Sequence, residues 1–185
     1  MRKIREGNPV NVNTKMNTKS LVLVALFLAL SFVGANITIF SSIALDSFPG
    51  FVAALLLGPL YGAAIGFLGH FFTALTSGFP LSIPIHLAIA VSMAVTMLGF
   101  GLTYKALKKK IPMAGNLVIT GIVGVILNAP VSLGFSMGTL ALIAGWEAAL
   151  GLLAMLPILL VASAINVVLG IVSFKPLERV WDKSA

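Results

Sequence analysis

The segment Lys105-Ala-Leu-Lys-Lys-Lys110 separates two long apolar blocks, and this separation decides the fold. Further basic clusters lie in residues 2–19 and 175–183. The blocks between the clusters, 20–104 and 111–174, contain neither Lys nor Arg. Short cytoplasmic loops of membrane proteins are enriched in these two residues. We therefore predict an all-α integral membrane protein whose termini and middle loop are cytoplasmic.

The composition agrees with this prediction. Of the 185 residues, 59% are hydrophobic and 9% are charged, whereas soluble domains carry about 25% charged residues. The net charge of +7 lies in predicted loops and tails, which does not indicate nucleic-acid binding. A chain without cysteine forms neither disulfides nor thiolate metal sites. We predict a single membrane domain over 1–185, with cytoplasmic tails at 1–18 and 175–185.

Six transmembrane helices fit the two blocks, because each block must hold an even number of spans and a span needs about 20 apolar residues. Gly58-Pro59 predicts a break between the second and third spans, since Gly ends helices and Pro begins them. A single tilted helix over 48–76 is the alternative, but it would place the middle basic cluster outside. The predicted spans are Lys19–Phe40, Ser47–Leu57, Pro59–Thr76, Pro84–Leu107, Met113–Leu133 and Ala148–Phe174. An outer loop near 134–147 would join the last two.

Small residues predict close helix packing in two spans. The third span carries a stripe of glycines at a spacing of four: Gly58, Gly62 and Gly66. Such a stripe lets helix backbones approach closely. His70 continues the stripe, so we expect it to face other helices and not lipid. In the first span, Ala25 and Ala29 form a small-xxx-small pair, which ordinary packing of an Ala-rich helix also explains.

The predicted topology brings side chains from distant parts of the chain to one outer depth. They comprise two acids, two histidines, an amide, a methionine and a tryptophan: Asp46, His70, His86, Met93, Asn128, Trp146 and Glu147. Polar side chains that meet at one depth beside apolar helices are typical of a ligand pocket. We therefore predict that these side chains form an outward-facing substrate-binding pocket.

Most of these residues also have a purely structural explanation. Asp46 could cap the second span, and Glu147 could be a solvated acid at a helix start. Trp146 and His86 could be interfacial residues. Met93 could fill the core.

Sequence motifs for several other functions are absent. The chain has no GxxxxGK[ST] sequence for ATP hydrolysis and no HExxH metal motif. Two histidines and two acids could still serve an intramembrane hydrolase, but no ligand pair has helical spacing. No acid or base lies mid-span to couple transport to protons. A substrate-capturing subunit powered by partner proteins fits best.

Several motifs carry a resemblance to a known family. They include Ala25-xxx-Ala29 and Gly58-Pro59-Leu-Tyr-Gly62. With the short second span, they make nearly the whole chain resemble the substrate-binding S component of an energy-coupling factor (ECF) vitamin transporter. The segments most similar to the branch assigned to α-ribazole, a cobalamin precursor, are Leu45-Asp46-Ser47-Phe48-Pro49, Gly69-His70 and Thr76-Ser-Gly-Phe-Pro80.

The resemblance implies a multi-pass transport protein in the plasma membrane of a prokaryote, not an enzyme. Its implied partners are a transmembrane coupling protein, contacted by Ala25 and Ala29, and two ABC ATPases. The partner ATPases use ATP and Mg²⁺, and the chain needs no cofactor of its own. Because the outer side lacks Lys and Arg, carboxylate and phosphate vitamins fit poorly. We expect α-ribazole as substrate, with thiamine and pantothenate as alternatives.

Overall fold

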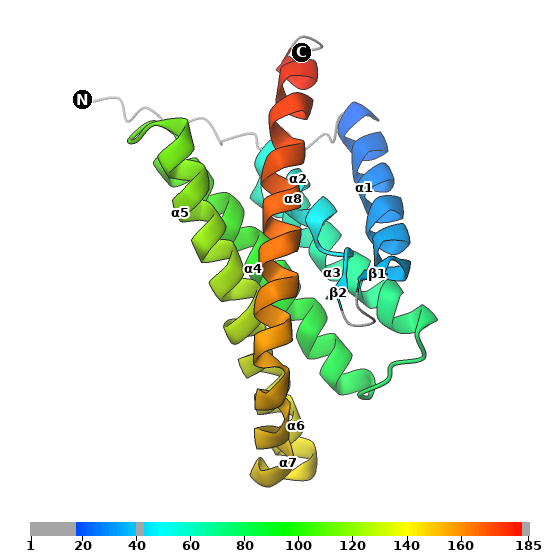
Figure 1. The fold of residues 1–185 in the computed structure, drawn as a ribbon. Coiled ribbons are helices and arrows are strands. Elements are labelled where there is room, and N and C mark those ends of the chain that lie inside the picture. The colour runs from blue at the N-terminus through cyan, green and yellow to red at the C-terminus, as the bar shows by residue number, and fades with distance from the viewer. Residues whose placement is uncertain (1–17, 40–42, 183–185) are drawn as a thin grey trace, which may run out of the picture.

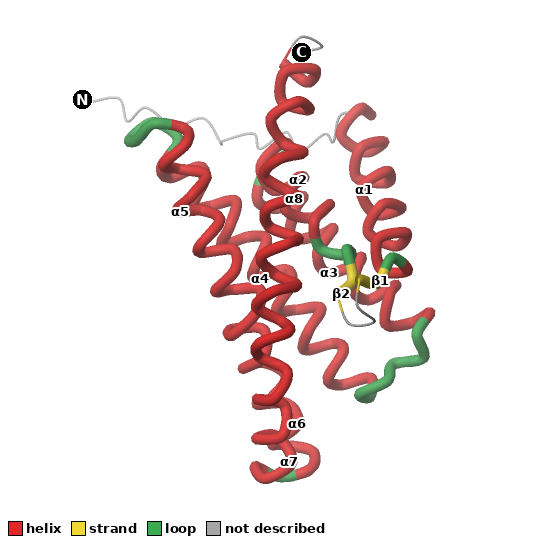
Figure 2. The backbone as a smooth tube through the Cα atoms, viewed as in Figure 1, coloured by secondary structure: helices red, strands yellow, loops and turns green. Residues whose placement is uncertain are grey.

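The computed structural model describes residues 18–39 and 43–182, which are almost entirely helical (Figures 1 and 2). Its helices are α1 (Thr18–Asn36), α2 (Phe48–Leu56), α3 (Pro59–Thr76), α4 (Ile83–Leu107), α5 (Met113–Ile126), α6 (Ser132–Ala144), α7 (Trp146–Gly151) and α8 (Leu156–Asp182). A π-helical segment, Leu127–Val131, joins α5 to α6, and a 3₁₀ segment, Leu152–Met155, joins α7 to α8. Two-residue strands β1 (Thr38–Ile39) and β2 (Ile43–Ala44) pair antiparallel. The all-α fold is confirmed.

The predicted break at Gly58-Pro59 is confirmed. Helix α2 ends at Leu56 and α3 begins at Pro59. Gly58 adopts a φ of 113°, which residues with a side chain rarely adopt. The alternative of one helix over 48–76 is therefore wrong.

Four helical stretches are long and apolar enough to cross a membrane within the described chain: Thr18–Asn36, Ile83–Leu107, Met113–Ala144 and Trp146–Trp181. Helix α2, with nine residues, is too short to span a bilayer. The membrane fold is confirmed, while the count of six spans stays a prediction.

The predicted outer loop near 134–147 is wrong, because α6 continues to Ala144. Gly134 and Gly138 lie inside α6, and membrane helices tolerate glycine. The chain reverses at Gly145, whose φ of 88° favours glycine. The legs α5–α6 and α7–α8 consequently form one long hairpin, whose α6–α7 tip lies at the opposite end from the C-terminus (Figure 1).

The described members of the three basic clusters lie at one end of the molecule. Lys19 Nζ is 4.2 Å from the centre of the Trp181 ring, and Lys108 Nζ is 3.9 Å from Glu178 Oε1. Since α1, the α4–α5 turn and the end of α8 meet there, all three clusters can face the same side of a membrane (Figure 1). This arrangement supports the predicted shared cytoplasmic side.

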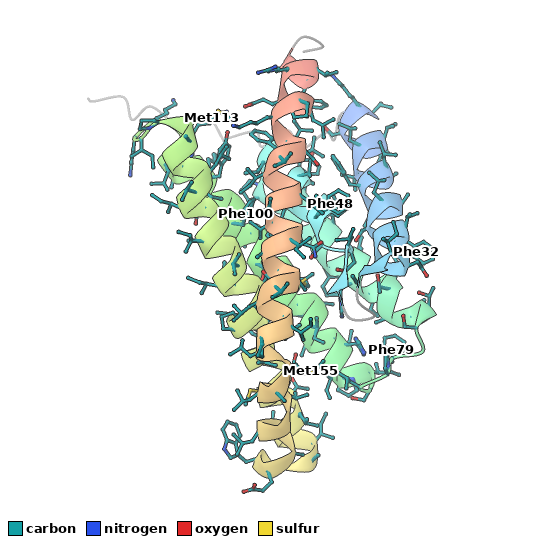
Figure 3. The ribbon with its side chains drawn as sticks, viewed as in Figure 1. Phe32, Phe48, Phe79, Phe100, Met113 and Met155 are labelled. Carbon is teal, nitrogen blue, oxygen red and sulfur yellow. The ribbon has the colours of Figure 1, made fainter. Side chains whose placement is uncertain are left out.

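Two of the three glycines of the predicted stripe, Gly62 and Gly66, pack closely against other helices, whereas Gly58 precedes α3 and has no described neighbour within 4 Å of its Cβ position. A Cβ atom added to Gly62 would lie 2.5 Å from Ala54 Cβ on α2, and one added to Gly66 would lie 3.0 Å from the Met93 carbonyl oxygen on α4. Phe51 of α2 also packs edge-on against Phe100 of α4, with ring centres 4.8 Å apart (Phe100 is labelled in Figure 3). Helices α2, α3 and α4 thus form a closely packed base for the site.

Candidate binding site

A cavity of about 190 Å³ lies between the β2–α2 segment, α3, α4, the α5–α6 leg and α8. The residues lining it are Ala44, Asp46, Ser47, His70, Ile89, Met93, Asn128, Ser132, Leu159, Ala162, Ser163 and Asn166. It therefore brings together four of the seven predicted pocket residues: Asp46, His70, Met93 and Asn128.

Larger hollows exist, but the largest of them has an almost entirely apolar lining. The largest described, about 610 Å³ between α5 and α8, is lined by apolar side chains and Lys175. Ligand sites combine an apolar wall with a few polar groups that fix orientation. The smaller polar cavity is therefore the candidate site.

Asp46, His70 and His86 form a polar string. Asp46 Oδ2 is 3.8 Å from His70 Nδ1, an ion-pair distance that is too long for a hydrogen bond. His70 Nε2 and His86 Nδ1 are 3.2 Å apart and share a hydrogen bond. The ring centres are 5.4 Å apart with an interplanar angle of 24°, so the two rings meet edge to edge. His86 thus supports His70 and is not among the described residues lining the cavity.

Asp46 does not act as a helix cap. Ser47 occupies the N-cap position of α2 and forms no side-chain capping bond within the described chain. Ser31 of α1 donates a hydrogen bond to the Asp46 backbone carbonyl, which ties this segment to α1. The Asp46 carboxylate is left facing His70 and the cavity.

Asn166 belongs to the cavity, although the sequence-based pocket did not include it. Its Oδ1 accepts a hydrogen bond from the Phe48 backbone N–H at 2.9 Å, and its Nδ2 donates to the Ala44 carbonyl at 2.9 Å. The side chain thereby fixes both ends of the Asp46 segment to α8. An amide in the middle of an apolar helix was the available signal, because such residues usually meet a polar partner.

Replacing Asn166 with Leu should destabilise the protein. The change removes the partners of two backbone groups, and each buried polar group left unpaired costs about 1–3 kcal/mol. We expect a clearly lower midpoint in thermal unfolding of the detergent-solubilised protein. Asn36→Leu is the matched control, because within the described residues the Asn36 amide bonds the Phe32 carbonyl of its own helix and ties no other segment to it. Equal effects of the two changes would contradict the anchoring role.

Asn128 provides an acceptor at the other side of the cavity. It lies in the π-helical segment that contains Pro130, which lacks a backbone N–H; such segments often occur at functional sites. Asn128 Nδ2 donates to Ser163 Oγ at 3.2 Å. Asn128 Oδ1 is buried and has no hydrogen-bond partner among the described residues. A ligand donor would satisfy it.

Trp146 and Glu147 lie at the start of α7, at the hairpin tip, and not in the cavity (Figure 1). The Trp146 side chain is 59% exposed. The reason is the continuation of α6, which carries both residues past the cavity. The structure therefore brings neither to the side chains they were predicted to accompany.

Ala25 and Ala29 are exposed on α1. Ala29 lines a shallow apolar groove between α1 and α3, together with Leu28, Phe32, Phe72, Leu75 and Thr76. Only Phe27, Ser31 and Gly34 of this helix are buried. Most of α1 is thus available to lipid or to another membrane protein.

A helical membrane protein with a small polar cavity between its helices has the features of a membrane-embedded binding protein. The family model described as "ECF transporter, substrate-specific component" matches residues 19–178, so the chain belongs to this family. Comparisons with curated proteins and with solved structures found no match. As a family member, the protein is a substrate-capture subunit that takes a vitamin-type small molecule and works with an ECF module.

Proposed function

We propose that this subunit captures α-ribazole at the outer face of a prokaryotic plasma membrane. It would then pass the ligand inward with an ECF coupling protein and two ABC ATPases. The ATPases would use ATP and Mg²⁺, and the chain itself would need no cofactor. The observation that carries the substrate assignment is the polarity of the cavity.

The cavity offers hydrogen-bond acceptors without a cation. Its described lining contains the Asp46 carboxylate and neither Lys nor Arg. Both amide hydrogens of Asn166 and one of Asn128 are used within the protein, whereas Asn128 Oδ1 has no described partner. An anionic vitamin would meet Asp46 without compensation. A neutral ligand with several hydroxyl donors is the best complement.

α-Ribazole joins such a hydroxyl-bearing sugar to a flat aromatic ring. The ribose hydroxyls could donate to Asp46 and Asn128 Oδ1. The benzimidazole could pack against the apolar wall of Ile89, Met93 and Leu159. At about 190 Å³ the cavity is smaller than the roughly 300–1,000 Å³ of typical ligand sites, so we expect it to widen when the riboside binds.

A calorimetric titration of the purified protein without ATP tests the substrate. We expect α-ribazole to bind tightly, dimethylbenzimidazole more weakly, and pantothenate not at all. The weaker binding of the free base follows from the loss of the sugar hydroxyls. A pantothenate response with none from either benzimidazole compound would overturn the assignment.

Thiamine is the second candidate, because the Asp46 carboxylate has His70 beside it but neither Lys nor Arg in the described cavity lining. A cationic ligand would supply that charge. Thiamine binding in the same titration, without α-ribazole binding, would select this alternative.

A further inference from the structure

Each leg of the α5–α8 hairpin is longer than the hydrocarbon core of a bilayer is thick. The stretch Met113–Ala144 has 32 residues, which corresponds to about 45 Å or more at roughly 1.5 Å per residue. The hydrocarbon core of a membrane is only about 30 Å thick. The α6–α7 tip accordingly extends past the loop that joins α3 to α4 (Figure 1).

The extended tip is apolar. Leu142 is 90% exposed, and Ile143 and Trp146 are each more than half exposed. Glu147 is the only charged residue between 111 and 174. A contiguous exposed apolar surface of this kind usually contacts a partner or a membrane.

We infer that the α6–α7 tip is a membrane anchor that lies in the outer interfacial layer of the bilayer. The apolar surface continues along both legs in residues that a membrane-spanning hairpin presents to lipid: Val118, Ile122, Ile126, Val161 and Val168. Trp146 suits the headgroup level, where tryptophan is enriched. Leu142 and Ile143 enter the hydrocarbon, and Glu147 reaches water.

Breaks in both legs allow the tip to reach this layer. Pro130 lies in the π-helical segment of the first leg, and the 3₁₀ segment of the second leg is followed closely by Pro157. Helices bend at such places. Tilt within the usual range of about 0–40° and these bends together let the tip lie in this layer. Asn128 lies in the π-helical segment, so one wall of the cavity belongs to the same leg of the hairpin as the anchored tip.

Tryptophan fluorescence tests the anchor. The chain has two tryptophans, so Trp181→Phe leaves Trp146 as the only one. In nanodiscs, lipids brominated near the headgroup should strongly quench Trp146, while aqueous iodide should quench it little. The measurement uses no ligand, so its outcome does not depend on the proposed substrate.

Each other outcome overturns the anchor. Stronger quenching by iodide than by brominated lipid would place the tip in water. Protection from both quenchers would place it against protein. In the same background, Leu142→Ser with Ile143→Ser should shift Trp146 towards iodide quenching. Val118→Ser, an equally apolar exposed site on the shaft of the hairpin, should not; equal shifts would show that the tip residues do not anchor.

Discussion

Replacing Asp46 with Ala should raise the Kd for α-ribazole about 10- to 100-fold. Hydrogen bonds to a charged group contribute about 1.5–3 kcal/mol, and 1.4 kcal/mol is about tenfold in affinity. The Asp46 carboxylate is the only acidic group in the described cavity lining, and His70 Nδ1 stands 3.8 Å from it. Its removal therefore takes away the strongest acceptor and leaves His70 Nδ1 without its ion-pair partner. Calorimetric titration of the purified variant measures the effect.

Two further variants show whether the affinity depends on the charge of Asp46 or only on its size, and whether an acid outside the cavity matters. Asp46→Asn keeps the size but turns one acceptor into a donor, so its affinity should fall nearly as far as that of the Ala variant. Glu147→Gln removes an acid at the hairpin tip, outside the described cavity lining, and should leave the Kd unchanged. Wild-type affinity in Asp46→Asn would show that the carboxylate charge is not used. A large loss of affinity in Glu147→Gln would show that the hairpin tip contributes to ligand binding.

The fold could largely be predicted from the distribution of charge. Basic clusters flanking apolar blocks predicted a helical membrane protein, and the Gly58-Pro59 pair predicted the break between α2 and α3. The error at 134–147 has a local cause. Gly134 and Gly138 resemble loop residues, yet a membrane helix continues through them because packing and lipid leave its backbone no other hydrogen-bond partner. Only Gly145, with its positive φ, ends the helix.

The sequence predicted those residues of the candidate site whose position follows from helix spacing or from the topology. The step of four from Gly66 to His70 gave the inward direction of His70, and the Asp46 loop followed from topology. The contribution of Asn166 could not be derived in this way. Its partner Phe48 lies 118 residues away in the sequence, so their contact depends on how α2 packs against α8. Trp146 and Glu147 were misplaced for the converse reason, since the extra length of α6 moved them away.

Filling the groove beside Ala29 should abolish uptake while leaving ligand binding intact. We propose that this groove receives a helix of the ECF coupling protein, because small residues allow membrane helices to pack closely. Ala29 is exposed, and the groove walls come from α1 and α3. Overpacking a close interface costs about 1–3 kcal/mol or more, and a bulky Trp at Ala29 would obstruct the helix outright. Uptake of labelled ligand by cells that express the ECF module should fall to background.

A variant that loses uptake but still binds the ligand has lost contact with a partner, whereas a variant that loses both has a damaged structure. The Ala29→Trp protein should bind α-ribazole with wild-type affinity, because the altered side chain points into the groove and not into the cavity, whose described lining contains no residue of α1. Val172→Trp is the matched control: Val172 is 62% exposed on α8 and lines none of the described hollows, so extra bulk there meets lipid. If the Val172 variant loses uptake to the same extent, bulk at any exposed position is harmful and the groove has no special role. If Ala29→Trp loses binding as well, α1 supports the cavity itself, and the proposed coupling surface must lie elsewhere.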